Sequence, residues 1–176
     1  MNKLRVLLIG SLVAMMALVA IAAIGGMMMD ANHIVVREAT YTRSAPELWS
    51  TITRFDQMPQ WRSDVDAVQI ESGDPVRFVE MGEQGPVPME VTEHDAPHRL
   101  VLMASSLDLP FSGTWTYELT EVEGGTRLRL TEAATIDNPV VRFVAHTFVD
   151  PADTAETYLV DLGQHLGETV TPQPPT

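Results

Sequence analysis

Apolar and polar positions follow three successive patterns along this chain of 176 residues. Residues 6–29 form an uninterrupted apolar run that contains no charge. From residue 34 to residue 136, apolar and polar residues mostly alternate, which is typical of half-buried strands. After residue 138, apolar residues recur every three or four positions, which predicts amphipathic helices. The order of these patterns predicts an α+β domain preceded by an apolar helix.

One helical segment interrupts the alternating part soon after it begins. Ser44 is a good N-cap residue, because its hydroxyl can accept a free amide of the first turn. Pro46 falls in that first turn, where its missing N–H costs little. The next apolar residues recur at helical spacing and share one face: Leu48, Trp49, Ile52 and Phe55.

The alternating part predicts seven strands separated by turn signals. The predicted ranges are 34–42, 65–71, 76–81, 87–93, 99–105, 114–122 and 126–136. Their apolar and polar faces are cleanly separated, which indicates an antiparallel sheet with one solvated side.

The C-terminal part predicts a broken helical region. Asn138 is suited to cap a helix and Pro139 to occupy its first turn. Pro151 should break or kink this helix, and an apolar stripe resumes after it. The last residues, 171–176, are rich in Pro and predict an extended or disordered tail.

Two segments are similar to the START-like (SRPBCC) superfamily, which includes the polyketide cyclase/dehydrase and lipid-transport families. The first is the order strand, helix, break and Pro59-Gln60-Trp61. The second is the passage from the last strand through Asn138-Pro139 into a helix with Arg142-Phe143 near its start. The resemblance covers roughly residues 34 to 168. It implies a helix-grip fold, in which a curved antiparallel sheet of about seven strands surrounds a long C-terminal helix and holds an apolar ligand.

The apolar run at the N-terminus has two main interpretations. Its 24 residues exceed the roughly 20 that a transmembrane helix needs, which favours an anchor. A cleaved signal peptide is the alternative, with residues 20–22 as the small-residue site. Lys3 and Arg5 precede the run and should stay in the cytoplasm, so either interpretation predicts an exported domain. A buried core helix is disfavoured because the run is not amphipathic.

The predicted organisation follows from these observations. Residues 1–29 are a transmembrane anchor or signal segment, and residues 30–33 are a linker. Residues 34–169 are the START-like domain, and residues 170–176 are the Pro-rich tail.

Composition excludes several classes of function. The chain has no Cys, which rules out a disulfide framework and a thiolate nucleophile. Beyond the apolar run it has nine basic and 24 acidic residues, a net charge of −15, and no Lys. Such a surface repels phosphate backbones, so we expect no nucleic-acid partner.

Two charged residues share the parity of apolar residues on their strands. Glu132 alternates in phase with Leu128, Leu130 and Ala134, and Arg37 with Val35 and Ala39. If both point inward, they either pair with each other or face a ligand, because a bare buried charge is costly. Strand twist or a bulge that exposes them is the alternative.

The candidate ligand-binding residues lie at predicted inward positions of the strands or on the apolar faces of the C-terminal helical region. They are Arg37, Tyr41, Trp115, Tyr117, Glu132, Phe143 and Tyr158. No catalytic residue is assigned, because the sequence contains no nucleophile elbow or other convincing catalytic pair. His94 and His98 flank a turn, so we predict neither a metal site nor a cofactor.

Three functions are compatible with the sequence. The first is a membrane-anchored domain that binds a small hydrophobic molecule or lipid between the sheet and the C-terminal helix. The second is a cyclase/dehydrase- or hydrolase-type enzyme in which Glu132 performs acid–base work with a hydroxyl such as that of Tyr117. The third is a scaffold domain with a filled core.

Overall fold

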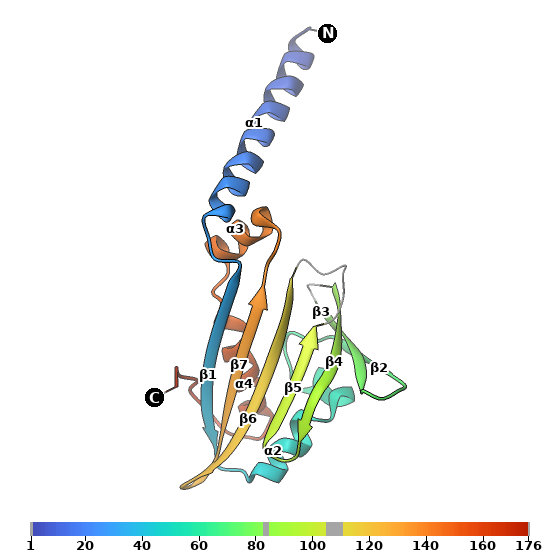
Figure 1. The fold of residues 1–176 in the computed structure, drawn as a ribbon, viewed down its shortest axis with the longest axis vertical. Helices are drawn as coiled ribbons and strands as arrows, with labels where there is room; N and C mark the ends of the chain where they lie inside the picture. Colours follow the sequence, from blue (N-terminus) through green and yellow to red (C-terminus); the bar gives the residue numbers. More distant parts are fainter. Residues whose placement is uncertain (1, 83–84, 105–110, 176) are drawn as a thin grey trace.

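The computed structural model describes residues 2–82, 85–104 and 111–175. It contains an N-terminal apolar helix, a seven-stranded antiparallel sheet and helices on one face of that sheet (Figure 1). The elements are α1 (Asn2–Met27), β1 (Asn32–Tyr41), α2 (Ala45–Ile52), the 3-10 helix η1 (Phe55–Gln60), β2 (Ala67–Glu71), β3 (Arg77–Gly82), β4 (Gly85–Asp95), β5 (Arg99–Ala104), β6 (Ser112–Val122), β7 (Gly125–Thr135), α3 (Pro139–Phe148) and α4 (Asp153–His165).

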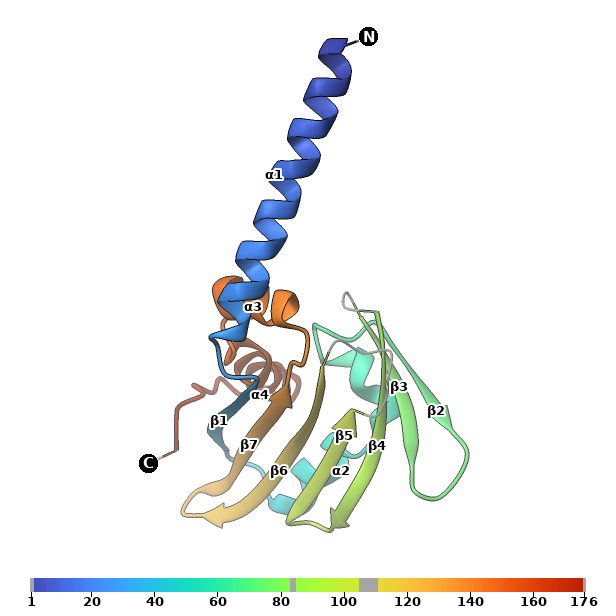
Figure 2. The same ribbon diagram turned by 45° about the horizontal axis from the view of Figure 1, so that its top comes forward.

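The sheet has the strand order β1-β7-β6-β5-β4-β3-β2, so the first strand pairs with the last one. The sheet curves, and α2, η1 and α4 lie within its concave side (Figures 1 and 2). The predicted α+β helix-grip fold is therefore confirmed, with every strand close to its predicted range. Ser105, the predicted end of one strand, lies outside the described residues.

The predicted helix boundaries have clear local causes. Ser44 and Glu47 form a capping box at the start of α2, in which the Ser44 amide donates to the Glu47 carboxylate at 3.0 Å. The Asn138 side chain accepts from the amides of Val140 and Val141 at 2.9 and 3.2 Å, which confirms it as a cap. The break predicted at Pro151 separates α3 from α4.

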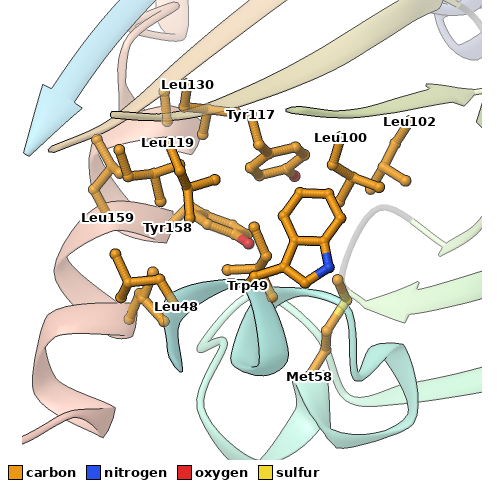
Figure 3. Packing of buried hydrophobic residues seen from close by; sticks show 14 of the residues in the cluster. Leu48, Trp49, Met58, Leu100, Leu102, Tyr117, Leu119, Leu130, Tyr158 and Leu159 are labelled. Atoms are coloured by element: carbon orange, nitrogen blue, oxygen red, sulfur yellow. The ribbon is translucent and has the colours of Figure 1, made fainter. Parts of the chain in front are cut away.

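The core lies between the concave face of the sheet and the helices. Every second residue of β7 from Thr126 to Ala134 is buried, as the alternation predicts. The opposing layer comes from the buried faces of α2 and α4 (Figure 3). The largest fully buried apolar residues are Tyr41, Leu48, Ile52, Met58, Phe78, Leu100, Leu102, Leu128, Leu130, Leu159 and Leu162.

The Pro-rich tail pairs with the free edge of β1 at one point. The backbone of Gln173 exchanges two hydrogen bonds with that of Glu38, at 2.9 and 3.0 Å. The Glu38 side chain is buried on the convex face, where Arg129 donates to it twice at 3.1 Å. Pairing protects a strand edge that is otherwise open to other chains.

Helix α1 extends away from the domain (Figure 2). Its segment Leu7–Met27 is 21 residues long and apolar enough to cross a membrane, and most of its residues are exposed, Gly26 near its end being buried. By length and composition it is a candidate membrane span or signal sequence.

Candidate functional site

Two tyrosines meet in the interior between the sheet and α4. Tyr117 comes from β6 and Tyr158 from α4, and each is 3% exposed. Their ring centroids are 5.2 Å apart, and Figure 3 shows both close to the indole of Trp49 of α2. Trp61, which follows η1, packs edge-on against Tyr158 at 5.1 Å. Burial raises the pKa of both tyrosines, so their hydroxyls stay protonated and can donate hydrogen bonds.

A buried ion pair lies next to Tyr158. The Arg62 guanidinium lies over the Tyr158 ring, 5.3 Å from its centroid, and donates to Glu80 at 2.8 Å. It also donates twice to Asp64, at 3.0 and 2.6 Å. The side chains of Arg62 and Glu80 are only 8% and 13% exposed. The pair therefore brings charge into the interior at the cost of desolvating both groups.

Glu132 lies on the same concave face. It sits on β7 directly opposite Trp115 of β6 and is 8% exposed. Burial raises the pKa of the Glu132 carboxyl to about 7, although a hydrogen bond from the Trp115 side chain acts in the opposite direction. Tyr117 and Leu130 form the next pair on this face of the sheet. The carboxyl is thus near its protonation midpoint at neutral pH.

Three buried polar atoms in this region have no hydrogen-bond partner among the described residues. They are the Glu132 Oε2, the Tyr158 hydroxyl and the Trp61 Nε1. Because buried polar groups in proteins nearly always have a partner, each of these atoms needs an explanation. Polar groups of a bound ligand or of water molecules in the interior would supply the missing bonds.

The structure brings four of the seven predicted residues together and separates the other three. Trp115, Tyr117, Glu132 and Tyr158 surround the same interior region. The buried Tyr41 lies farther along β1 and donates from its hydroxyl to the Leu159 carbonyl at 2.8 Å. The Tyr41 hydroxyl therefore has its hydrogen-bond partner within the protein.

Arg37 and Phe143 contact residues outside this interior region. Arg37 points toward α4, as its parity predicts, but it pairs with Glu156 at 2.6 Å and not with Glu132. The predicted alternative of an Arg37–Glu132 pair is therefore wrong, because α4 supplies a closer carboxylate. Phe143 lies on α3, where its ring faces Gly25 of α1. Ligand contact by any of the seven residues stays a prediction.

The sequence analysis missed Arg62 and Glu80. Glu80 shares the parity of the buried Phe78 on β3, which is the same signal that singled out Glu132. Arg62 lies in the turn after η1, where no periodicity assigns a side chain to the interior. Its burial depends on the long-range approach of this turn to Glu80 of β3.

The interior is packed with side chains (Figure 3). A hollow of about 320 Å³ lies instead at the β6–β7 turn, at the opposite end of β7 from Glu132. It is lined by Thr42, Arg43, Ser44, Glu121, Val122, Gly124, Gly125 and Thr126. Within the described ranges, no three His, Cys, Asp or Glu residues are grouped as metal ligands.

Solved structures share this fold at low sequence identity. A START superfamily protein from Mycobacterium smegmatis is 17% identical, with a TM-score of 0.62 over 77% of this chain and 97% of that one. A protein from Rhodobacter sphaeroides is 22% identical, with a TM-score of 0.54 over 77% and 99% of the two chains. Truncated norcoclaurine synthase from Thalictrum flavum is 10% identical, with a TM-score of 0.62 over 77% and 93%.

These identities support a common fold alone. No curated protein matches the chain. The family model described as "Polyketide cyclase / dehydrase and lipid transport" matches residues 32–157, from the start of β1 into α4. That range includes the whole sheet and three of the four residues of the interior region, and it ends one residue before Tyr158. Since the match covers most of the sequence, the chain belongs to the polyketide cyclase/dehydrase and lipid transport family.

Proposed function

We propose that this domain binds a small hydrophobic molecule or lipid between the sheet and α4. The observation that supports this function most directly is the set of three unpartnered polar atoms in an otherwise apolar interior. A ligand with an apolar body and one or two polar groups matches that lining, because ligand sites combine apolar walls with a few placed polar groups. Glu132 and Tyr158 are the groups that would orient it.

The proposed entrance is at the end of the sheet where β7 leaves toward α3. Trp115 is only half-buried there, and its ring lies 6.5 Å from that of Phe111. Two aromatic side chains that are partly exposed can rotate at a lower cost than the fully buried Leu100 and Leu102 of the neighbouring strand. Their movement would open a path to Glu132.

We further propose that α1 anchors the domain to a membrane and that the domain lies on the extracytoplasmic side. The exposed apolar side chains along Leu7–Met27 support the anchor. Lys3 and Arg5 precede the span, and the positive-inside rule then keeps the N-terminus in the cytoplasm. Secretion after signal cleavage is the alternative. An anchored domain would meet membrane-dissolved ligands at a raised effective concentration.

Acid–base catalysis is a second candidate function, and the pKa of Glu132 favours it. A carboxyl that titrates near pH 7 is suited to donate or accept a proton at neutral pH. Loss of such a group typically lowers turnover by two to four orders of magnitude. A binding domain would instead keep most of its ligand affinity in Glu132→Gln.

Native mass spectrometry of the detergent-extracted protein tests the binding function. We expect the parent protein to carry a hydrophobic ligand and Ala134→Trp to lose it while remaining folded. Ala134 is buried at the next inward position along β7 from Glu132, opposite Gly113 of β6. Trp at this position would therefore occupy the ligand's space.

The matched control is Ala133→Trp, since Ala133 is the adjacent residue on the opposite face of β7. It should retain the ligand. If the parent carries no ligand and Ala134→Trp loses the 1–3 kcal/mol typical of overpacking, the interior is a solid core. That result would reject the binding function in favour of a scaffold.

The stability of the domain should depend on pH through Glu132. The folded-state pKa of about 7 lies above the ordinary value of 4.5, so folding favours the protonated carboxyl. This stability is present in full below pH 4.5 and is lost as the pH rises through 7. The expected loss is roughly 3–3.5 kcal/mol, since the pKa of about 7 lies about 2.5 units above 4.5 and each unit corresponds to about 1.4 kcal/mol.

Glu132→Gln should remove this dependence, because the amide has no charge at any of these pH values. Chemical unfolding of both proteins between pH 4.5 and pH 8 should show that the free energy of unfolding of the variant increases relative to that of the parent as the pH rises. Glu121→Gln, which removes an exposed carboxylate of β6, controls for the lost negative charge. If the stability of the parent and that of Glu132→Gln change with pH in the same way, the pH dependence does not come from Glu132.

A further inference from the structure

Helix α3 is amphipathic, yet the protein buries none of its residues. Val141, Val144 and Phe148 follow one another at spacings of three and four, so they share a face of the helix. Val144 is 47% exposed and Phe148 is 77% exposed. Such an apolar face normally packs against a core, but here Val144 and Phe148 are exposed and only Val141 is half-buried.

The position of α3 relative to α1 is set by close contacts. A Cβ on Gly26 would lie 1.7 Å from the Pro139 carbonyl oxygen, so only glycine permits this approach. At the preceding position, Gly25 faces the ring of Phe143 in the same way. Both figures of the fold show α3 at the foot of α1 (Figures 1 and 2).

Arg142 strengthens the same junction. Its guanidinium donates to the Gly26 and Met29 carbonyls of the α1 end, at 3.1 and 3.3 Å, and to the Ile136 carbonyl at 2.9 Å. A cation at a helix C-terminus also interacts favourably with the helix dipole. These bonds join α1, α3 and the end of the sheet at one side chain.

If α1 spans a bilayer, the length of α1 determines where α3 lies relative to the membrane. A helix of 21 residues such as Leu7–Met27 is about 31 Å long, which matches a hydrocarbon core of about 30 Å. The last turn of α1 then lies at the membrane surface, and α3 packs against that turn. Met27 and Met28, which are 71% and 85% exposed, extend the apolar surface of α1 toward α3.

The charge of this segment also distinguishes it from the rest of the domain. Residues 138–149 contain no acidic residue, although the chain has 24. The charged or titratable side chains of α3 are Arg142 and His146. An apolar face without carboxylates is compatible with burial at the boundary of headgroups and acyl chains.

We propose that α3 lies on the surface of the membrane that α1 spans, with Val144, Phe148 and Val149 inserted at the bilayer interface. This inference rests on the anchored arrangement proposed above. It directs the α3 end of the sheet, which includes Trp115 and Glu132, toward the lipid. A lipid ligand would then pass between the bilayer and the interior without crossing bulk water.

Spin labelling of single cysteines tests this arrangement, because the chain has no native Cys. The full chain is reconstituted in phosphatidylcholine vesicles, with a nitroxide attached to Val144→Cys or Phe148→Cys. Met16→Cys, in the middle of α1, marks the bilayer core. Ile70→Cys marks the aqueous side, since Ile70 is a 51% exposed residue of β2, far from α1. The nitroxide's collision rates with apolar oxygen and with a water-soluble nickel chelate report its depth.

We expect labels at residues 144 and 148 to collide with oxygen several-fold more, relative to the nickel chelate, than the label at residue 70. The label at residue 16 should show the same preference more strongly. If the labels at residues 144 and 148 show the same relative collision rates as the label at residue 70, while the label at residue 16 is in lipid, the docking of α3 is overturned. The anchor would remain supported. A label at residue 16 that meets the nickel chelate freely would overturn the anchor itself.

Discussion

Replacing Arg62 with methionine is expected to destabilise the folded domain by about 3–5 kcal/mol, the usual cost of breaking a buried ion pair by removing one partner. The cost arises at Glu80, whose side chain is 13% exposed and receives the 2.8 Å bond from Arg62. Asp64 is 42% exposed, so water can replace its lost bonds. Thermal or chemical unfolding of the full chain in detergent measures the effect.

The double variant Arg62→Met/Glu80→Met is the control for this interpretation. It removes both charges and keeps apolar volume, which is often neutral or stabilising for a buried pair. The destabilisation of Arg62→Met should therefore largely disappear when Glu80 is also replaced. It should also shrink at low pH, where the unpaired Glu80 carboxyl can take up a proton. Equal losses in the single and double variants would show that packing of the Arg62 side chain, and not its charge, stabilises the interior.

Replacing Trp49 with alanine is expected to cost about 3–5 kcal/mol, as for other buried large aromatic residues. Trp49 is 8% exposed and lies between α2 and the sheet, where its ring contacts that of His94 edge-on at 4.9 Å. Removing the indole leaves a cavity that the fully buried Leu48 and Ile52 cannot fill from their own positions on α2. The midpoint of thermal unfolding should fall by several degrees or more.

Ile70→Ala is the matched control for Trp49→Ala, because it truncates a large apolar side chain that is 51% exposed on β2. We expect its effect to stay within about 0.5 kcal/mol, as for ordinary surface substitutions. An unchanged stability of Trp49→Ala would show that α2 is not firmly docked on the sheet.

Several features of the fold could be predicted because they depend on local chemistry. The cap at Asn138 and the break at Pro151 follow from the backbone groups of a few neighbouring residues. The inward direction of Glu132 follows from the strict alternation along β7. Alternation is less reliable in β4, where the register to β5 shifts between Val91 and Glu93.

The partners of the inward residues could not be predicted in the same way. Parity directed Arg37 toward the interior, but its partner Glu156 lies 119 residues away on α4. The placement of α4 across β1 decides that pair, and periodicity contains no information about it. Arg62 and Trp61 follow η1 in a turn, so only the packing of that turn against α4 and β3 brings them to Tyr158 and Glu80.

The sequence by itself determined the elements of this protein: one apolar helix, a two-faced antiparallel sheet and an amphipathic C-terminal region. These depend on interactions between residues that are close along the chain. Only the tertiary structure decided that polar atoms of Glu132, Tyr158 and Trp61 find no hydrogen-bond partner within the described part of the chain, and that α3 packs at the end of α1. Both results depend on how distant elements come together, because burial and hydrogen-bond partners are properties of the assembled core and not of any one segment.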